Sequence, residues 1–307
     1  MTEYAVSVRD LTKRYGPRTV VDHIALDLLP GRICGFLGPN GSGKTTVLRM
    51  ICGLLIPDAG GGSVLGLDLA RDRLQIKAQI GYMTQRFGLF EDLTIRENLR
   101  FVADVHGLDD ARAAVNGALD RLGLASRADQ LAGSLSGGWK QRLALAACVL
   151  HNPRILLLDE PTAGVDPQAR RDFWDQIHAL ANDGVTVLVS THYMDEAERC
   201  HDIAYIAYGA MLARGTGAEI IAASGLFALT GTGPDADRLA HRLQTLPGVD
   251  TAAAFGASIH VCGRDANALR AAVAGVAGID WHVTAPTLED VFIDLMRTAP
   301  DNSLISR

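Results

Sequence analysis

Two segments of the sequence contain residues whose types and spacing could bind a nucleoside triphosphate and activate water. Residues 38–46 read GPNGSGKTT and fit the spacing G-x-x-x-x-G-K-[ST]. Glycines let successive backbone N–H groups turn toward phosphate oxygens, while the lysine and hydroxyl reach the β- and γ-phosphates and Mg²⁺. Residues 154–160 read RILLLDE, an apolar run that ends in two carboxylates. Such carboxylates can hold Mg²⁺ and polarise an attacking water molecule.

We expect the glycine-rich loop to provide most of the contacts with the nucleotide. The candidate residues in it are Gly38, Pro39, Asn40, Gly41, Ser42, Gly43, Lys44, Thr45 and Thr46. Asp159 would hold Mg²⁺ through water, and Glu160 would polarise the attacking water. The alternatives are a chance glycine turn, and a Glu160 that is only a solvated charge at a strand end. The loop alone does not separate kinases, GTPases and ATPases.

These residues require a sheet that brings the ends of several strands together. Apolar runs that favour buried strands alternate with helical patterns, and they occupy residues 32–37, 80–85, 154–160 and 184–192. This alternation predicts an α/β fold with a parallel sheet covered on both faces. Ligands bind at the carboxyl ends of the strands in such sheets. Residues 4–8 and 23–28 alternate apolar and polar types, as half-buried strands do.

The middle of the sequence, about residues 86–150, is expected to form a helical subdomain. Thr94 and Glu97 have the spacing of a capping box at the start of a helix. Farther along, Asp166 followed by Pro167 predicts the start of another helix between two buried strands.

Residues 135–141, LSGGWKQ, complete a pattern that resembles the ATP-binding subunits of ABC transporters. In that family the Ser-Gly-Gly turn begins a helix whose N-terminus points at ATP bound to the other protomer. The resemblance implies that Ser136, Gly137 and Gly138 contact ATP across a head-to-tail homodimer. Glycine suits this role because the backbone must approach phosphate without a Cβ. Trp139 departs from the glutamine that is common at the fifth position of this signature.

Other positions also match the family. The resemblance implies that Tyr15 stacks on adenine, that Gln85 contacts Mg²⁺ and the attacking water, and that His192 contacts the γ-phosphate. The alternative is an ordinary packed tyrosine and a structural histidine. Residues 163–166, AGVD, match the loop between protomers, although Gly-Val stands where Ala-Leu is commoner. The implied catalytic residues are Glu160, His192, Gln85 and Lys44, and the implied Mg²⁺ ligands are Thr45, Gln85 and Asp159.

The resemblance also predicts the domain organisation. Residues 1–217 would form an ABC-type P-loop ATPase domain, with a parallel sheet core, an antiparallel β subdomain and the helical subdomain. Residues 226–307 are Ala-rich, and their strand and helix pattern predicts a small ferredoxin-like α+β accessory domain. Residues 286–296, PTLEDVFIDLM, resemble the ending of ABC-2-type multidrug ATPases, similar to the daunorubicin-resistance exporters. The alternative for this segment is an amphipathic helix that packs on the small domain.

Composition bears on the partners and the location. The 35 acidic and 29 basic residues give a net charge of −6, so we expect no nucleic-acid partner, because such binders carry basic patches. Five scattered cysteines indicate a reducing compartment. The first ten residues lack the pattern of a signal peptide, and no apolar run approaches the ~20 residues of a membrane span. We expect a cytoplasmic chain held at the cell membrane by a separate permease.

The function implied by the resemblance is therefore ATP hydrolysis that powers a transporter. The expected partner is an integral-membrane permease of the ABC-2 type, and the expected direction is export of drugs or other hydrophobic compounds. The alternative is a soluble ABC-type ATPase that acts on ribosomes or DNA. A P-loop kinase or small GTPase would explain neither the LSGGWKQ segment nor His192.

Overall fold

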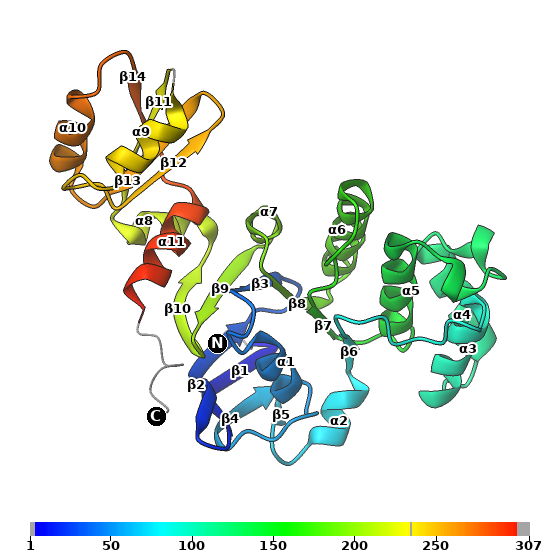
Figure 1. The fold of residues 1–307 in the computed structure, drawn as a ribbon. Helices are drawn as coiled ribbons and strands as arrows, with labels where there is room; N and C mark the ends of the chain where they lie inside the picture. The colour runs from blue at the N-terminus through cyan, green and yellow to red at the C-terminus, as the bar shows by residue number, and fades with distance from the viewer. Residues whose placement is uncertain (1–3, 234, 300–307) are drawn as a thin grey trace. The chain divides into compact units, whose positions relative to one another are not determined.

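The computed structural model describes the chain except residues 1–3, 234 and 300–307. The described residues form two compact units that divide between Met211 and Leu212 (Figure 1). The predicted regions 1–217 and 226–307 both extend at their ends into residues that lie outside the described part of the chain.

A six-stranded sheet with the order β10-β9-β3-β8-β7-β6 forms the core of the first unit, and its edge strand β10 continues beyond Met211. The neighbours among β3, β6, β7, β8 and β9 run parallel, which confirms the predicted parallel core. The register pairs Leu37 with Thr191 and Asp159 with Ser190, so the carboxyl ends of these strands meet at one edge. The strands are β3 (Ile33–Leu37), β6 (Ile80–Met83), β7 (Ile155–Asp159), β8 (Thr186–Thr191), β9 (Asp202–Ala207) and β10 (Ala210–Gly215).

Both faces of this sheet are covered by apolar side chains. Successive strand residues point to opposite faces, so Leu157 packs in the core that contains α1, whereas Leu156 and Leu158 pack with residues of α5 and α6. Burial on both sides explains why residues 155–158 of β7 are continuously apolar. The helices beside the sheet are α1 (Lys44–Ile51), α2 (Arg73–Ala78), α5 (Gly137–Val149), α6 (Pro167–Asn182) and α7 (Met194–Ala197).

A second, antiparallel sheet has the order β2-β1-β4-β5. Its strands are β1 (Val6–Tyr15), β2 (Arg18–Leu28), β4 (Ala59–Val64) and β5 (Leu67–Asp68). The first two strands are longer than the predicted runs at 4–8 and 23–28. They continue as a hairpin that pairs Tyr15 with Arg18, beyond the part where residue types alternate regularly.

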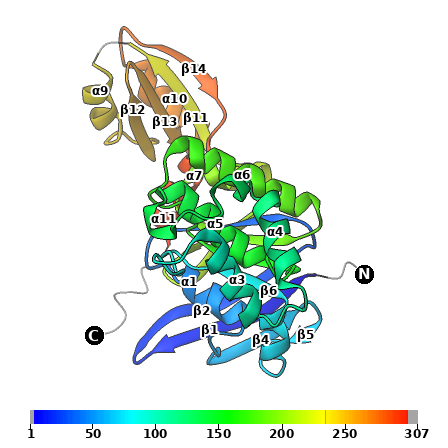
Figure 2. The same cartoon turned by 90° about the vertical axis from the view of Figure 1, so that its right-hand side faces the viewer.

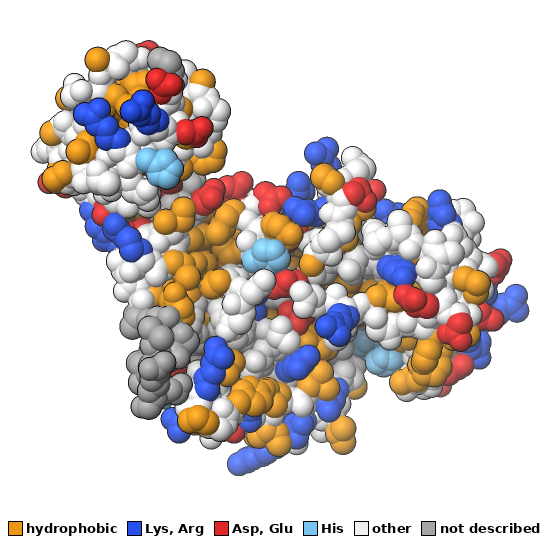
Figure 3. Space-filling model, in the orientation of Figure 1, with side chains coloured by type: hydrophobic (Ala, Val, Ile, Leu, Met, Phe, Trp, Pro, Cys, Tyr) orange, Lys and Arg blue, Asp and Glu red, His pale blue; other side chains and the backbone are white. Residues whose placement is uncertain are grey.

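The helices α3, α4 and α5 pack together as the predicted helical part (Figure 2). The capping box is confirmed, because the Glu97 N–H donates to Thr94 Oγ1 at 3.1 Å and the Thr94 N–H donates to Glu97 Oε2 at 2.8 Å. Basic and acidic side chains are interspersed on the drawn face of these helices (Figure 3). The remaining elements here are α3 (Ile95–Val105), α4 (Ala111–Arg121) and the short 3₁₀ turns Ala125–Arg127 and Ala132–Ser134.

The second unit contains a four-stranded antiparallel sheet with the order β12-β13-β11-β14. The helices α9 and α10 contribute to an apolar core with residues of this sheet. The order strand, helix, two strands, helix, strand follows the predicted α+β pattern. The elements are α8 (Gly217–Ser224), β11 (Phe227–Thr232), α9 (Ala236–Leu243), β12 (Thr251–Phe255), β13 (Ser258–Gly263), α10 (Ala266–Ala274), β14 (Asp280–Thr284) and α11 (Leu288–Thr298).

Candidate functional site

The glycine-rich loop connects β3 to α1 at the carboxyl edge of the parallel sheet. Gly38 has φ 156°, and a Cβ there would lie 2.0 Å from the carbonyl oxygen of Ile206. Gly43 has φ 105°, and its Cβ would lie 2.7 Å from the carbonyl oxygen of Val20. Both positions therefore require glycine, because a side chain would displace backbone atoms. The loop is fixed by packing against neighbouring backbone as well as by its own turns.

Lys44 lies inside this loop with a side chain that is only 4% exposed. Its Nζ donates to the carbonyl oxygens of Gly38 at 2.7 Å and Pro39 at 3.0 Å, and lies 3.4 Å from Glu160 Oε1. Burial lowers the pKa of Lys44, and the Glu160 carboxylate opposes this effect. The buried hydroxyl of Ser42 finds no hydrogen-bond partner among the described residues. A buried ammonium and an unpartnered hydroxyl within one loop fit the oxygens of a phosphate group.

Asp159 at the end of β7 and Thr45 in the first turn of α1 offer oxygen ligands that suit a divalent cation. The hydroxyl of Thr45 donates to Asp159 Oδ1 at 3.1 Å, and the Ser190 hydroxyl donates to the same oxygen at 2.8 Å. Carboxylate and hydroxyl oxygens are suited to Mg²⁺, which also keeps several of its waters. The structure therefore brings together Thr45 and Asp159, two of the three predicted metal ligands. Ser190 was missed by sequence reasoning, because it contacts Asp159 only through the register of β7 and β8.

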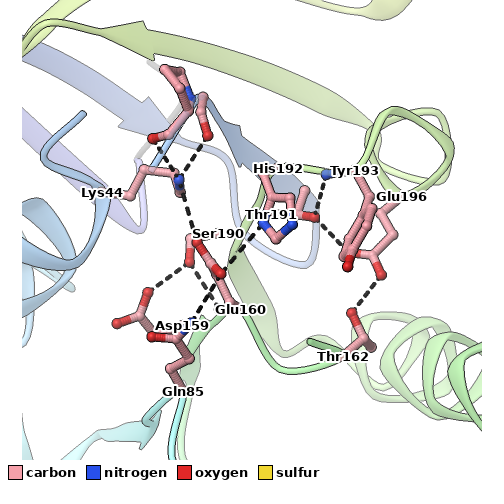
Figure 4. A network of polar contacts seen from close by, with 12 residues as sticks. Lys44, Gln85, Asp159, Glu160, Thr162, Ser190, Thr191, His192, Tyr193 and Glu196 are labelled. Atoms are coloured by element: carbon pink, nitrogen blue, oxygen red, sulfur yellow. Dashed lines mark hydrogen bonds and ion pairs between the residues drawn. The ribbon is translucent and has the colours of Figure 1, made fainter. Parts of the chain in front are cut away.

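The other three predicted catalytic side chains contact the carboxylate of Glu160 (Figure 4). Gln85 Nε2 donates to Glu160 Oε2 at 3.1 Å, and His192 Nδ1 lies 3.4 Å from the same oxygen. With Lys44 on the other oxygen, all four predicted catalytic side chains form one group. Glu160 has φ 47°, an uncommon left-handed conformation, and its N–H donates to Ser190 Oγ at 3.0 Å. Gln85 lies in the loop after β6, which ends at Met83 and not at the predicted residue 85.

The Ser-Gly-Gly segment begins α5, as predicted. Ser136 is the N-cap residue, and its side chain makes no capping hydrogen bond to the described residues of that helix. A Cβ on Gly138 would lie 2.5 Å from the Cβ of Ala169 in α6, so this glycine also permits close packing of two helices within one chain. Two guanidinium groups lie over the ring of Trp139: Cζ of Arg127 is 4.5 Å and Cζ of Arg142 is 4.8 Å from the ring centre.

The predicted ATP contacts are not all in one place. Ser136 and Gly138 line one pocket together with Asp166 and residues of α6, and the described residues that line it include none of the glycine-rich loop. Tyr15 is 52% exposed at the end of β1, with Lys13 Nζ 5.9 Å from its ring centre.

Comparisons with known proteins agree with this geometry. The sequence profile of the ABC transporter family matches residues 21–163. The Nod factor export ATP-binding protein I of Paraburkholderia xenovorans (strain LB400) is 38% identical over 299 residues, which are 96% of this chain and 98% of that protein. The chain belongs to the ABC transporter family of ATP-binding proteins.

Other ABC relatives match over different shares of their length. The probable multidrug ABC transporter ATP-binding protein YbhF of Escherichia coli (strain K12) is 44% identical over 72% of this chain, which spans only 39% of YbhF. The daunorubicin resistance ATP-binding protein DrrA3 of Streptomyces coeruleorubidus is 35% identical, with 96% of each chain covered. Among solved structures, an ATP-binding subunit of an ABC transporter superimposes with TM-score 0.65 and 29% identity, over 72% of this chain and 93% of that one.

This family membership confirms the predicted fold class and activity. An ABC-type ATP-binding domain is followed here by a small α+β unit, and ABC ATPases hydrolyse ATP to drive transport. The alternative of a soluble ATPase acting on ribosomes or DNA is not favoured, because these relatives are named as transporter or export proteins. Within the described part of the chain, no helix has the length and apolar character needed to span a bilayer.

One polar group of this ABC domain was not predicted. Glu196 in α7 is 1% exposed and lies between the segment after Glu160 and the segment before His192. Its carboxylate accepts hydrogen bonds from the hydroxyls of Thr162 and Thr191, the latter at 2.6 Å. Arg170 Nε lies 3.5 Å from the same carboxylate. Glu196 therefore ties together the two segments that hold Glu160 and His192.

Proposed function

We propose that this chain hydrolyses Mg²⁺-bound ATP with Glu160 as the residue that polarises the attacking water. The observation that carries the proposal is the convergence of Lys44, Gln85 and His192 on the Glu160 carboxylate. Thr45 and Asp159 would hold Mg²⁺, which would neutralise charge on the phosphates. Lys44 and the loop N–H groups would bind the phosphates, and Gln85 and His192 would orient water and the γ-phosphate.

The proposed working unit is a head-to-tail homodimer. Ser136, Gly137 and Gly138 would contact the γ-phosphate of ATP held by the loop of a second copy. This is supported by the position of Ser136 at the start of α5, where helix N–H groups favour anions, and by its side chain, which makes no capping bond to the described residues of the helix. Tyr15, which is half exposed, would stack on adenine.

The proposed partner is an ABC-2-type permease, and the proposed location is the cytoplasmic face of the cell membrane. The names of the relatives support export of drugs or other hydrophobic compounds, because they refer to multidrug transport, Nod factor export and daunorubicin resistance. No nucleic-acid partner is proposed. Of the two phenylalanines after Gln85, Phe87 packs against the core, whereas Phe90 is 47% exposed and meets Phe101 edge to face at 5.1 Å. Phe90 is therefore the better candidate for the permease surface.

The test of this function is Glu160→Gln in the full chain. The variant keeps the shape of the side chain but removes its negative charge, so we expect ATP affinity to persist while steady-state hydrolysis falls by at least ~100-fold. With Mg²⁺-ATP, the variant should also accumulate a nucleotide-bound dimer, measured by sedimentation velocity. Glu289→Gln, an exposed change in the second unit, is the matched control and should hydrolyse ATP normally. Wild-type turnover in Glu160→Gln would reject the role given to this residue.

A further inference from the structure

The four-stranded sheet of the second unit has two chemically different faces. Ile259 and Val261 of β13 belong to the apolar core that includes residues of α9 and α10. Because successive strand residues point to opposite faces, His260 and Cys262 project to the other side of the sheet. Asp290, in the first turn of α11, contacts His260 there at 3.0 Å. This second face therefore carries a histidine and a thiol, with the carboxylate of Asp290 against them.

The ligating atoms of these three side chains converge. His260 Nε2 lies 3.0 Å from Asp290 Oδ2 and 3.3 Å from Cys262 Sγ, and one ligand atom from each of the three side chains lies within 4.8 Å of the other two. Cys262 is fully buried and Asp290 is 7% exposed. Nitrogen, oxygen and sulfur ligands of a tetrahedral zinc ion lie roughly 3.3–3.6 Å apart, given metal–ligand distances of about 2.0–2.3 Å. Shifts of a few tenths of an ångström would open space for such an ion.

The arrangement differs from that of a cysteine nucleophile activated by histidine. In such a relay the thiol and the carboxylate contact different nitrogens of the imidazole ring. Here both contact Nε2, whereas Nδ1 lies 3.0 Å from the hydroxyl of Thr230, which lies 3.1 Å from the hydroxyl of Thr284. A metal-binding histidine is held in this way, with an outer partner on one nitrogen and the other nitrogen directed at the ion.

We propose that His260, Cys262 and Asp290 bind a divalent metal ion of the zinc class. Imidazole, thiolate and carboxylate together favour Zn²⁺ or Co²⁺ over Mg²⁺ and Ca²⁺, which prefer oxygen ligands. His260 and Asp290 also line a cavity of about 320 Å³ whose other walls include Phe255 and Ile293. The remaining coordination position faces this cavity, where a water molecule or a small anionic ligand completes the site.

The metal ion links β13 to the start of α11 within the second unit. Asp290 already caps this helix, because its Oδ2 accepts from the N–H of Thr287 at 2.7 Å and from the Thr287 hydroxyl at 2.8 Å. One carboxylate thus serves both the helix N-terminus and the ion. Zinc that binds only the folded unit raises its stability by mass action.

The test is a titration of the full chain with Co²⁺, which serves as the spectroscopic probe. The chain is first freed of metal with a chelator, and no nucleotide is added. One equivalent of Co²⁺ should produce the ultraviolet charge-transfer band of a cobalt–thiolate bond, and Zn²⁺ should abolish the band by displacement. Cys262→Ser should eliminate the band. Thr230→Val, which removes only the outer partner of His260, should weaken Co²⁺ affinity by about 10–100-fold.

Cys52→Ser is the matched control, because Cys52 is also a buried thiol but lies at the end of α1, outside this group. It should keep the band and the affinity. The proposal is overturned if the wild-type chain gives no cobalt–thiolate band, or if the band survives Cys262→Ser. The wild-type measurement does not depend on whether a variant folds, and neither readout involves ATP hydrolysis, so failure of this proposal leaves the proposed function untouched.

Discussion

Gly138 in the first turn of α5 is expected to be required by helix packing before any nucleotide binds. A Cβ at this position would lie 2.5 Å from the Cβ of Ala169. Relieving such a contact moves α5 away from α6, and overpacking of this kind costs about 1–3 kcal/mol. Alanine is the better helix former by up to ~1 kcal/mol. Gly138→Ala should therefore lower the free energy of unfolding by up to about 2 kcal/mol.

The partner change, Ala169→Gly, removes the methyl group that Gly138→Ala would strike. Alone it should cost up to ~1 kcal/mol, because glycine is less favourable than alanine in a helix, and Ala169 lies in the first turn of α6. In the double variant the steric conflict is absent, so the two changes should couple favourably by about 1–3 kcal/mol. The free energies of the wild type and three variants are measured by urea unfolding, with ATP hydrolysis measured on the same preparations.

Helix packing and phosphate contact, the two roles considered for Gly138, predict different results for the double variant. If packing alone demands it, the double variant should recover both stability and hydrolysis. If the backbone must also approach phosphate, stability should return while hydrolysis stays low. Strict additivity of the two single changes in the free energy of unfolding would refute the packing argument, because residues in steric conflict cannot act independently.

Three further changes probe other parts of the ATPase unit. Lys44→Ala should weaken the binding of a fluorescent ATP analogue in an equilibrium titration, and unchanged affinity would contradict its phosphate contact. Glu196→Gln should lower the free energy of unfolding in urea by about 1–3 kcal/mol, because it disturbs the hydrogen bonds that the buried Glu196 side chain accepts from the hydroxyls of Thr162 and Thr191. An unchanged urea midpoint would contradict a stabilising role for Glu196. Burial, and then neighbouring His106, lowers the pKa of His151 to about 4. Between about pH 6.5 and 4 the unfolded chain therefore binds more protons than the folded chain, so the free energy of unfolding decreases as the pH falls through this range. The His151 ring stacks on that of His106, with ring centres 4.0 Å apart. His151→Phe keeps a ring at this position and should make the urea midpoint less dependent on pH between about 6.5 and 4; an unchanged pH dependence in the variant would exclude His151 as its cause.

Much of the ATPase site could be predicted because its chemistry is encoded by local spacing. The loop at 38–46 needs glycine at positions where backbone crowds backbone, and it directly follows a buried strand. Glu160 and His192 each follow an apolar strand, and parallel strands bring their carboxyl ends to one edge. The structure therefore gathers residues that lie far apart in the chain but share a position relative to their strands.

The unpredicted residues lack such a local signal. Ser190 matters because the register of β7 and β8 sets it beside Asp159, and a serine in an apolar run gives no indication of that pairing. Glu196 follows His192 in a segment of ordinary polar composition, and its burial depends on how α7 packs. In the second unit, Cys262 resembles a small buried hydrophobe in the sequence, and only the fold brings Asp290 to it.

The contacts of Glu160 also constrain how nucleotide enters the site. This carboxylate lies 3.4 Å from Lys44 Nζ, 3.1 Å from Gln85 Nε2 and 3.4 Å from His192 Nδ1. These are the groups that we propose to contact phosphate, Mg²⁺ and water. Where one of these groups turns to ATP, it exchanges its contact with Glu160 for a contact with nucleotide. Because each displaced group gives up an existing contact, the net affinity for ATP is smaller than the sum of the contacts that ATP makes.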